Sequence, residues 1–265
     1  MNASVPILMY HSVAEDPPAS TRRLSVSPHA FAEQVALLAG CGFTAMTFSA
    51  LADAFETKRS LPERPVVLTF DDGYADFAAN AWPILKRHGF PATVFVTTGW
   101  MADAGPNAAG RPLDAMLDRA QVRALADAGI EIGAHSHSHP KLDQLSDVAL
   151  RRELVDGRAL LEEYVDAPVE AIAYPYGYSN RRVRLATQAA GYRRAAAVRN
   201  LRATPTDDLF RLPRLTIRRS TSQATFAAAV AGNDGRLFWR DRLMTAGWAS
   251  VRGVRRAGRR VTQDV

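Results

Sequence analysis

Residues 66–77 read VVLTFDDGYADF, an apolar stretch typical of a strand that leads directly into Asp71, Asp72 and Gly73. Two neighbouring carboxylates raise each other's pKa, and burial at the end of a strand raises the cost further. A bound cation is the usual compensation. The question is therefore whether the rest of the chain supplies ligands for one.

Strand-like and helix-like stretches alternate along almost the whole chain. The pattern predicts strands at 5–10, 43–46, 65–70, 91–96, 130–134, 169–174, 194–198 and 212–217, and helices at 27–42, 49–57, 74–89, 114–128, 146–164 and 180–190. Ser27 and Ser146 are suited to N-caps, and Pro83 should kink a helix or begin one. This alternation predicts a single-domain α/β fold, a distorted (β/α) barrel of seven or eight β/α units.

Composition narrows the function classes. The chain has 265 residues, 47% of them hydrophobic, and a single cysteine, Cys41, so it has no internal disulfide. No glycine-rich phosphate-binding loop follows any predicted strand, which argues against a nucleotide-binding protein. No apolar run is long enough to span a bilayer, and the N-terminus lacks the basic start of a signal peptide. We therefore expect a cytoplasmic location, provided that Met1 is the native start.

The net charge of +6 comes from the C-terminal segment. Residues 235–265 hold eight arginines against two aspartates, and residues 1–234 balance at 25 basic and 25 acidic side chains. We expect residues 1–220 to form the catalytic domain and 221–265 a helical, basic extension. That extension also carries tryptophans, so a weak contact with an anionic membrane surface, a solvated tail and a helix packed on the barrel all remain open. Nucleic-acid binding is not expected.

Polar side chains follow several of the predicted strands at the point where each strand ends. His11, the Asp71–Asp72 pair, the histidines of HSHSH (135–139) and the segment 174–177 all lie at such positions. In a β/α barrel the carboxyl ends of the strands meet at one face, where active sites form. These residues are therefore expected to share one site.

The HSHSH segment offers metal ligands. His135 and His139 are four residues apart and can face one metal, while His137 faces elsewhere. With one carboxylate they make a two-histidine, one-carboxylate site that leaves positions open for water and substrate. Asp72 would be the carboxylate ligand, and Asp71 would accept a proton from water as general base. A surface histidine cluster and a pair of helix-capping aspartates are the alternatives.

Three motifs, TFDDG (69–73), HSHSH (135–139) and AYPYG (173–177), resemble those of the polysaccharide deacetylases, the NodB-homology carbohydrate esterases. The resemblance covers about residues 5–220. It implies a distorted β/α barrel, a divalent metal that is commonly Zn²⁺, with Co²⁺ or Ni²⁺ as alternatives, and removal of N-acetyl or O-acetyl groups from a glycan. It also implies that Asp71 is the base and that Asp72, His135 and His139 bind the metal.

The chain departs from the family pattern at two places. Ala173 stands where the family has an arginine that holds the catalytic aspartate, and no histidine follows His139 to act as the acid. The N-terminal LMYH is similar to the poly-N-acetylglucosamine deacetylase branch, in which the histidine-bearing strand comes first. By that resemblance His11 is the general acid. Arg214 is the expected substitute for the missing arginine, although His11 could merely end a strand and Arg214 could be an ordinary surface residue.

The remaining candidates concern the substrate. The backbone N–H of Tyr176 would donate to the oxyanion from a tight turn that Pro175 and Gly177 favour. Tyr174 and Pro175 are candidate substrate-binding residues, and Trp100 could stack on a sugar ring. Leu142 is similar to an apolar residue that lines the acetyl pocket of the family. For Tyr174 and Trp100, plain packing is the alternative.

The function expected from these residues is metal-dependent hydrolysis of N-acetyl groups on an N-acetylhexosamine glycan. Two alternatives remain. One is an amidohydrolase for a small non-sugar amide, which a closed pocket capped by residues 98–113 would favour over an open groove. The other is a glycan-binding relative that has lost catalysis, which Ala173 and the displaced acid keep open.

Overall fold

A computed structural model describes residues 4–233 of the chain. Within these residues eight strands form one parallel sheet in the order β7-β6-β5-β4-β3-β1-β8, and β2 pairs with the start of β3 on the side opposite β1. The strands are β1 (Ile7–Tyr10), β2 (Thr44–Met46), β3 (Pro65–Phe70), β4 (Thr93–Val96), β5 (Glu131–Ala134), β6 (Ala171–Ala173), β7 (Arg194–Ala196) and β8 (Leu215–Thr216). The helices are α1 (Pro28–Gly40), α2 (Phe48–Glu56), α3 (Trp82–Arg87), α4 (Arg119–Asp127), α5 (Asp147–Val165), α6 (Arg181–Ala189) and α7 (Gln223–Val230).

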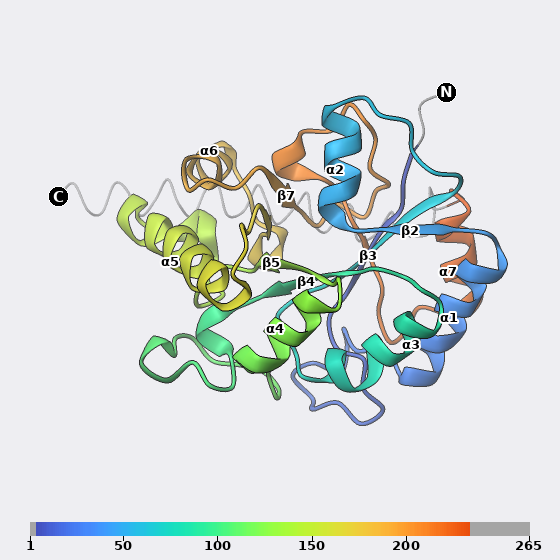
Figure 1. Ribbon diagram of the computed structural model, residues 1–265, viewed down its shortest axis with the longest axis horizontal. Helices are drawn as coiled ribbons and strands as arrows, with labels where there is room; N and C mark the ends of the chain where they lie inside the picture. The colour runs from blue at the N-terminus through green and yellow to red at the C-terminus, as the bar shows by residue number, and fades with distance from the viewer. Residues whose placement is uncertain (1–3, 234–265) are drawn as a thin grey trace.

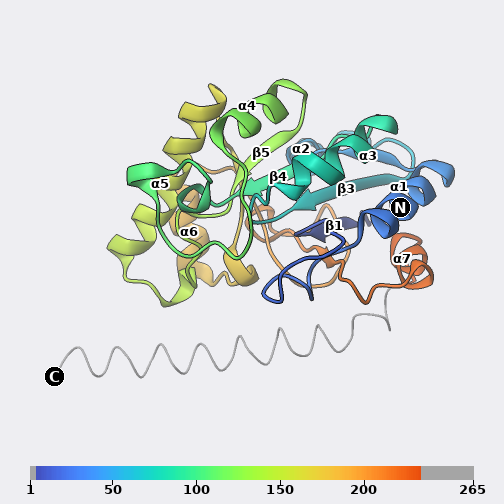
Figure 2. The same ribbon diagram turned by 90° about the horizontal axis from the view of Figure 1, so that it is seen from below.

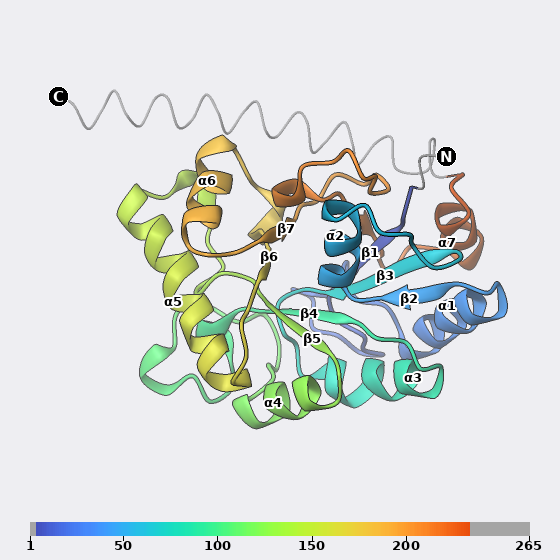
Figure 3. The ribbon, with the colours of Figure 1, turned by 45° about the horizontal axis from the view of Figure 1, so that its top comes forward.

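The sheet curls into the distorted barrel that the sequence predicts. Helices α1, α3, α4 and α5 follow one another along its outer side (Figures 1 and 3). Its two edges approach each other next to β8, since Leu212 forms a parallel bridge with Ala196 of β7 and the N–H of Asn200 donates to the carbonyl of Arg214. These irregular contacts bring the short strand β8 between β7 and β1. On its other side β1 pairs with β3, with Tyr10 opposite Phe70, so the residues that follow these two strands lie at the same rim.

Alternation along the strands assigns each side chain to the inside or the outside of the barrel. Ile7, Val67 and Phe95 pack in the inner cluster with apolar residues of α2. Leu8 and Leu68, one residue further along the same strands, belong to the outer cluster beneath the surrounding helices. Because both faces are covered, the strands read as continuous apolar runs.

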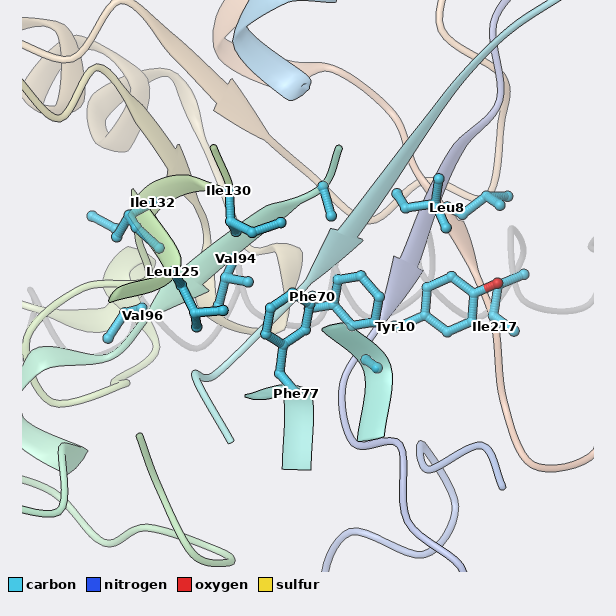
Figure 4. Close-up of a cluster of buried hydrophobic side chains, with 14 of the residues drawn as sticks. Leu8, Tyr10, Phe70, Phe77, Val94, Val96, Leu125, Ile130, Ile132 and Ile217 are labelled. Carbon is cyan, nitrogen blue, oxygen red and sulfur yellow. The ribbon is translucent and has the colours of Figure 1, made fainter. Parts of the chain in front are cut away.

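Aromatic side chains fill the outer layer next to the ends of β1 and β3. The ring of Phe70 stacks on Tyr10 with centroids 5.2 Å apart and meets Phe77 edge-on at 4.7 Å (Figure 4). Phe31 of α1 packs edge-on against both Tyr10 and Phe70. The cluster fixes the end of β3, and therefore the backbone from which Asp71 projects.

Helix α2 closes the barrel at the amino ends of the strands. The backbone N–H of Phe48 donates to the hydroxyl of Thr93 at the start of β4. The buried guanidinium of Arg194 pairs with Asp53 of α2 and with Glu170. With that end closed, the open face of the barrel is the one at the carboxyl ends of the strands.

The start signals of three helices are confirmed. Ser27 caps α1 with its hydroxyl accepting from the N–H of Ala30, and Pro28 is the first helical residue. Ser146 caps α5 in the same way. Pro83 lies in the first turn of α3, which follows a short π-helical turn at Phe77–Ala81. Pro83 therefore marks a helix start, one of the two outcomes that the sequence allows.

The folded body continues past the domain boundary expected at residue 220. Helix α7 lies beside α1 (Figure 2), and its Phe226 and Ala229 are fully buried in the outer core. The expected basic extension and its membrane contact fall mainly on residues 234–265, which lie outside the described residues. Among the helices of residues 4–233, none combines the length and the apolar character needed to cross a bilayer.

Candidate active site

The Asp71–Asp72 pair turns sharply at the end of β3. Asp71 continues the alternation of the strand and points into the barrel with Thr69, whereas Asp72 has φ +75° and Gly73 has φ +85°. A side chain on Gly73 would meet Val96 at 3.3 Å, so the backbone passes close to the end of β4. The positive φ of Asp72 is a strained conformation for a residue with a side chain, of the kind that concentrates at functional sites.

Asp72, His135 and His139 converge on one point, as the sequence predicts. Asp72 Oδ1 lies 3.4 Å from Nε2 of His135 and 3.3 Å from Nε2 of His139. His135 Nδ1 lies 2.8 Å from the carbonyl oxygen of Ala173, and because a carbonyl only accepts, this nitrogen carries the proton. In the neutral ring the other nitrogen, Nε2, therefore has a free lone pair on the side of Asp72.

This donor set fits a divalent metal ion. The three candidate ligand atoms lie within 4.8 Å of one another, and within residues 4–233 no hydrogen bond satisfies the buried Asp72 Oδ1. Burial alone would raise the pKa of Asp72, but the adjacent His135 and His139 side chains, together with the charge of His11, hold it well below its ordinary value. His137 does face elsewhere, with Nδ1 2.8 Å from the hydroxyl of Thr98.

Asp71 is held by Arg214, the substitute that the sequence suggests. Arg214 Nη1 lies 2.6 Å from Asp71 Oδ1 and Nη2 lies 2.7 Å from Oδ2, with both side chains buried. Thr69 accepts a further bond from Nη1, and the guanidinium lies over the ring of Phe95. Burial would raise the pKa of Asp71, but the charges of Arg214 and His135 outweigh it and lower the pKa. Asp71 is therefore ionised and fixed in orientation, and Arg214 is no surface residue.

His11 lies in the same pocket, directly after β1. Its Nδ1 is buried and has no hydrogen-bond partner among residues 4–233. The described contacts therefore do not support the alternative of a strand-ending histidine whose Nδ1 is bonded to backbone. Burial lowers the pKa of His11, although the carboxylates of Asp72 and Asp71 act in the opposite direction. The ring is thus a half-buried titratable group facing both aspartates.

A pocket of about 240 Å³ opens over these residues. Tyr176 forms one side of it from a tight turn, in which Tyr176 has φ +60° and Gly177 has φ +73°. The exposed ring of Tyr176 meets the edge of His139 at 4.8 Å and stacks on Tyr178 at 5.5 Å. A side chain on Gly177 would come within 2.5 Å of Val198, so the turn requires glycine there.

None of the four predicted substrate-binding residues lines this pocket. Tyr174 is fully buried, and its hydroxyl donates to the carbonyl of Phe210. Leu142 is fully buried in the outer core, and Pro175 is buried beneath the turn. Trp100 is 5% exposed and packs 4.7 Å from the ring of His139. Packing, the alternative for Tyr174 and Trp100, is the role that these positions support.

The sequence did not indicate most of the remaining wall. It is built by Met9, Ser20, Thr21, Leu24, Tyr74, Leu113, Val198, Thr216 and Arg218. Burial and the nearby carboxylate of Asp72 raise the pKa of Tyr74, which is therefore neutral. Ser20 and Leu113 come from two separate loops joined by a hydrogen bond of 3.0 Å from the Ser20 hydroxyl to the Leu113 carbonyl. Contacts between loops leave no periodic pattern in the sequence, so they could not be predicted. Tyr74 directly follows the TFDDG motif, and that position could have identified it as a pocket residue.

Comparison with known proteins identifies the class. The family model described as "Polysaccharide deacetylase" matches residues 58–195, just over half of the chain. YxkH of Bacillus subtilis, whose name assigns it to the same family, is 26% identical over 86% of this chain and 76% of its own length. The poly-β-1,6-N-acetyl-D-glucosamine N-deacetylase of Escherichia coli is 34% identical over 50% of this chain, but the match spans only 20% of that enzyme.

A solved structure agrees with the fold over nearly its whole length. The Streptococcus pyogenes deacetylase PplD, solved in complex with acetate, has a TM-score of 0.77 and 26% identity, and the match covers 87% of this chain and 99% of that one. The fold and the pocket thus define a (β/α)-barrel hydrolase that acts on amide bonds. The chain belongs to the polysaccharide deacetylase family, and within it resembles the poly-N-acetylglucosamine deacetylase branch.

Proposed function

We propose that this protein removes N-acetyl groups from an N-acetylhexosamine-containing poly- or oligosaccharide, in a reaction that depends on a divalent metal ion. One observation carries the proposal. The possible metal ligands Asp72, His135 and His139 share a pocket with an Asp71 that Arg214 holds in place and with His11. A metal-dependent deacetylase needs a metal site, a base and an acid within reach of one bond, and this pocket offers candidates for all three.

Asp72, His135 and His139 would hold the metal, which is most simply Zn²⁺, with Co²⁺ or Ni²⁺ as alternatives. When bound, such an ion supplies Lewis acidity that makes water a better nucleophile near neutral pH and polarises the substrate carbonyl. The bond from His135 Nδ1 to the Ala173 carbonyl keeps the ring in the tautomer that a metal ligand requires. Ala173 thus contributes through its backbone at the position where the family has an arginine.

Asp71 would accept the proton of the attacking water. Its lowered pKa keeps it ionised at neutral pH, and the two bonds from Arg214 fix the carboxylate plane. Both oxygens of Asp71 already accept from Arg214, so the proton arrives on a lone pair that this pairing leaves unused. Arg214 acts through Asp71 and is therefore a positioning residue.

His11 would donate a proton to the leaving amine nitrogen. It reaches the pocket from β1, beside the end of β3, so its ring lies across from the two aspartates. The backbone N–H of Tyr176 would donate to the carbonyl oxygen as negative charge develops there. Its turn is held by a 2.7 Å bond from the N–H of Gly177 to the carbonyl of Tyr174.

The names of the relatives support the substrate class. The Escherichia coli and Staphylococcus aureus relatives are named as poly-β-1,6-N-acetyl-D-glucosamine N-deacetylases, and the solved PplD structure holds acetate, the product of such a reaction. The exposed Tyr176 ring at the pocket mouth offers an apolar face on which a sugar ring can stack.

The test measures acetate release from N-acetylglucosamine oligomers of increasing length, with protein stripped of metal and with zinc restored. Zinc-dependent release that Asp71→Asn abolishes is the expected result. Stoichiometric zinc binding without acetate release from any acetylated glycan would contradict the proposal.

One observation favours a small non-sugar amide as a second candidate. The bond between Ser20 and Leu113 joins two loops across one side of the pocket, and Leu113 belongs to the segment expected to cap a closed pocket. Oligomers separate the two candidates. A glycan deacetylase gains kcat/KM with chain length, whereas an enzyme for small amides is faster on a short acetamide than on any oligomer.

A further inference from the structure

The carboxylate of Glu153, in the second turn of α5, binds the loop that carries the two histidines. Its Oε2 accepts from the backbone N–H of His137 at 2.9 Å and from that of Ser138 at 2.8 Å. Its Oε1 accepts from the hydroxyl of Ser138 at 2.5 Å. Three donors of the segment between His135 and His139 therefore end on one side chain. No motif named in the sequence includes Glu153.

This loop has a backbone that does not form by default. Ser136 has φ +64° and His139 has φ +60°, both in the left-handed region that residues with a side chain rarely adopt. The Ser136 hydroxyl accepts from the backbone N–H of His139 at 3.0 Å, and this bond links the two residues with left-handed backbone conformations. A conformation of this kind persists only where surrounding contacts determine it.

Helix α5 approaches the loop closely enough to act as one wall. A methyl group on Gly157, one turn after Glu153, would lie 3.2 Å from the N of His137 and 3.2 Å from the carbonyl carbon of Ser136. Gly157 therefore lets the helix backbone pass against the loop, and Glu153 binds the loop from the same helix face.

The opposite wall is the segment after β4. The N–H of Gly99 donates to the carbonyl of His137 at 2.7 Å, and the Thr98 hydroxyl lies 2.8 Å from His137 Nδ1. The loop is thus bound on both sides of His137, by α5 and by residues 98–99. With His135 also fixed through Ala173, the position of His139 depends on how the turn between them is held.

We propose that Glu153 is a positioning residue that sets the geometry of the His135–His139 pair, and with it the affinity of the site for its metal. The inference rests on the metal site of the proposed function. Partners that orient metal ligands in this way change metal affinity by about 10- to 100-fold when they are removed. Glu153 acts indirectly, because it binds the backbone and the Ser138 hydroxyl of the loop and not the side chains of the metal ligands.

The test compares zinc dissociation constants of full-length variants, measured by competition with a chromophoric chelator. Glu153→Ala is expected to raise the zinc dissociation constant about tenfold or more and to alter the visible spectrum of the cobalt-loaded protein. Glu153→Gln is the rescue variant, because its amide oxygen can accept both backbone N–H groups while its NH₂ donates to Ser138. We expect it to stay within about threefold of wild type. Asp156→Ala, an exposed carboxylate on the same helix, is the matched control and should change neither quantity.

Gly157→Ala provides an independent arm. Alanine is a better helix former than glycine, so α5 itself gains stability, while the new methyl group pushes on the loop. A raised zinc dissociation constant in the folded variant is expected, because the methyl group displaces the loop from the Glu153 carboxylate. If Glu153→Ala fails to fold, this arm still shows whether the contact of α5 with the loop sets metal affinity.

Three results separate this inference from the proposed function. Folded Glu153→Ala and Gly157→Ala proteins that bind zinc as wild type does, with an unchanged cobalt spectrum, would overturn the inference alone. Glu153→Gln binding as weakly as Glu153→Ala would also overturn it, since the shape of the contact is kept. Wild-type protein that binds none of zinc, cobalt and nickel would overturn the inference and the proposed function together.

Discussion

Arg214 and Asp71 form a bidentate ion pair inside the barrel, with Nη1–Oδ1 at 2.6 Å and Nη2–Oδ2 at 2.7 Å. The two residues are 143 positions apart in sequence, at the entrance to β8 and the exit of β3. A buried carboxylate with one fixed orientation is what a general base needs. The arginine of this family's third motif is absent at Ala173, and the arginine that contacts Asp71 comes from a different strand.

Replacing Arg214 by Met should cost both activity and stability. The change leaves Asp71 buried without its counter-charge, a loss of about 3–5 kcal/mol in the free energy of unfolding for a broken buried pair. We expect kcat/KM for an N-acetylglucosamine oligomer to fall by about 100-fold, measured as acetate release. Arg151→Met, at an exposed position on α5, is the control and should keep both values.

The same variant should shift the pH dependence in a defined direction. In wild type the charge of Arg214 helps to lower the pKa of Asp71, so the base stays ionised as the pH falls. Without Arg214, burial raises this pKa, and the acidic limb of the kcat/KM profile moves to higher pH. A profile with an unmoved acidic limb, in a variant that folds, would show that Asp71 is not the group titrating there.

Asp71→Asn and His135→Ala should separate catalysis from metal binding. Both should reduce turnover by at least about 100-fold, because one removes the base and the other a candidate metal ligand. Only His135→Ala should lose zinc, measured by metal analysis after dialysis, since Asp71 faces Arg214 and lies outside the Asp72 cluster. Zinc loss in Asp71→Asn with zinc retained in His135→Ala would reverse the two assignments.

The sequence predicted the part of the site that lies on regular elements. Asp71, Asp72 and His11 end buried strands, where the alternation of the strand and the geometry of a barrel determine which rim they reach. His135 and His139 follow β5 directly, so their spacing predicted a shared ligand position. Arg214 was located by asking what could replace a missing charge near Asp71, and the structure places it in a bidentate pair with that aspartate.

The sequence could not predict contacts that depend on loop conformation. Ser20 and Leu113 meet across 93 residues, and nothing periodic brings them together. Trp100 and Tyr174 were named because they follow a strand or belong to a motif, and Leu142 because it is similar to a family residue that lines the acetyl pocket. Packing in the core also requires large apolar side chains at such positions. Only the folded arrangement tells which of these side chains face the pocket.

Phe70→Ala should destabilise the protein by about 3–5 kcal/mol, because the ring is buried between Tyr10, Phe31 and Phe77 and its loss leaves a cavity. Chemical denaturation measures the change in the free energy of unfolding. Val148→Ala, an exposed position on α5, should change it by less than about 0.5 kcal/mol. A loss below about 1 kcal/mol for Phe70→Ala would mean that this cluster does not hold the end of β3.

His11→Asn should lower kcat by about 10² to 10⁴ with KM nearly unchanged, because a general acid acts in the transition state and not in substrate binding. The leaving group provides the sharper measurement. Release of an amine from an N-acetyl sugar needs a proton, whereas 4-nitrophenyl acetate loses its phenolate without one. The variant should therefore lose much more rate on the N-acetylated oligomer than on the activated ester. His88→Asn, an exposed histidine at the end of α3, is the matched control. Equal losses on both substrates would assign His11 to a role other than protonation of the leaving group.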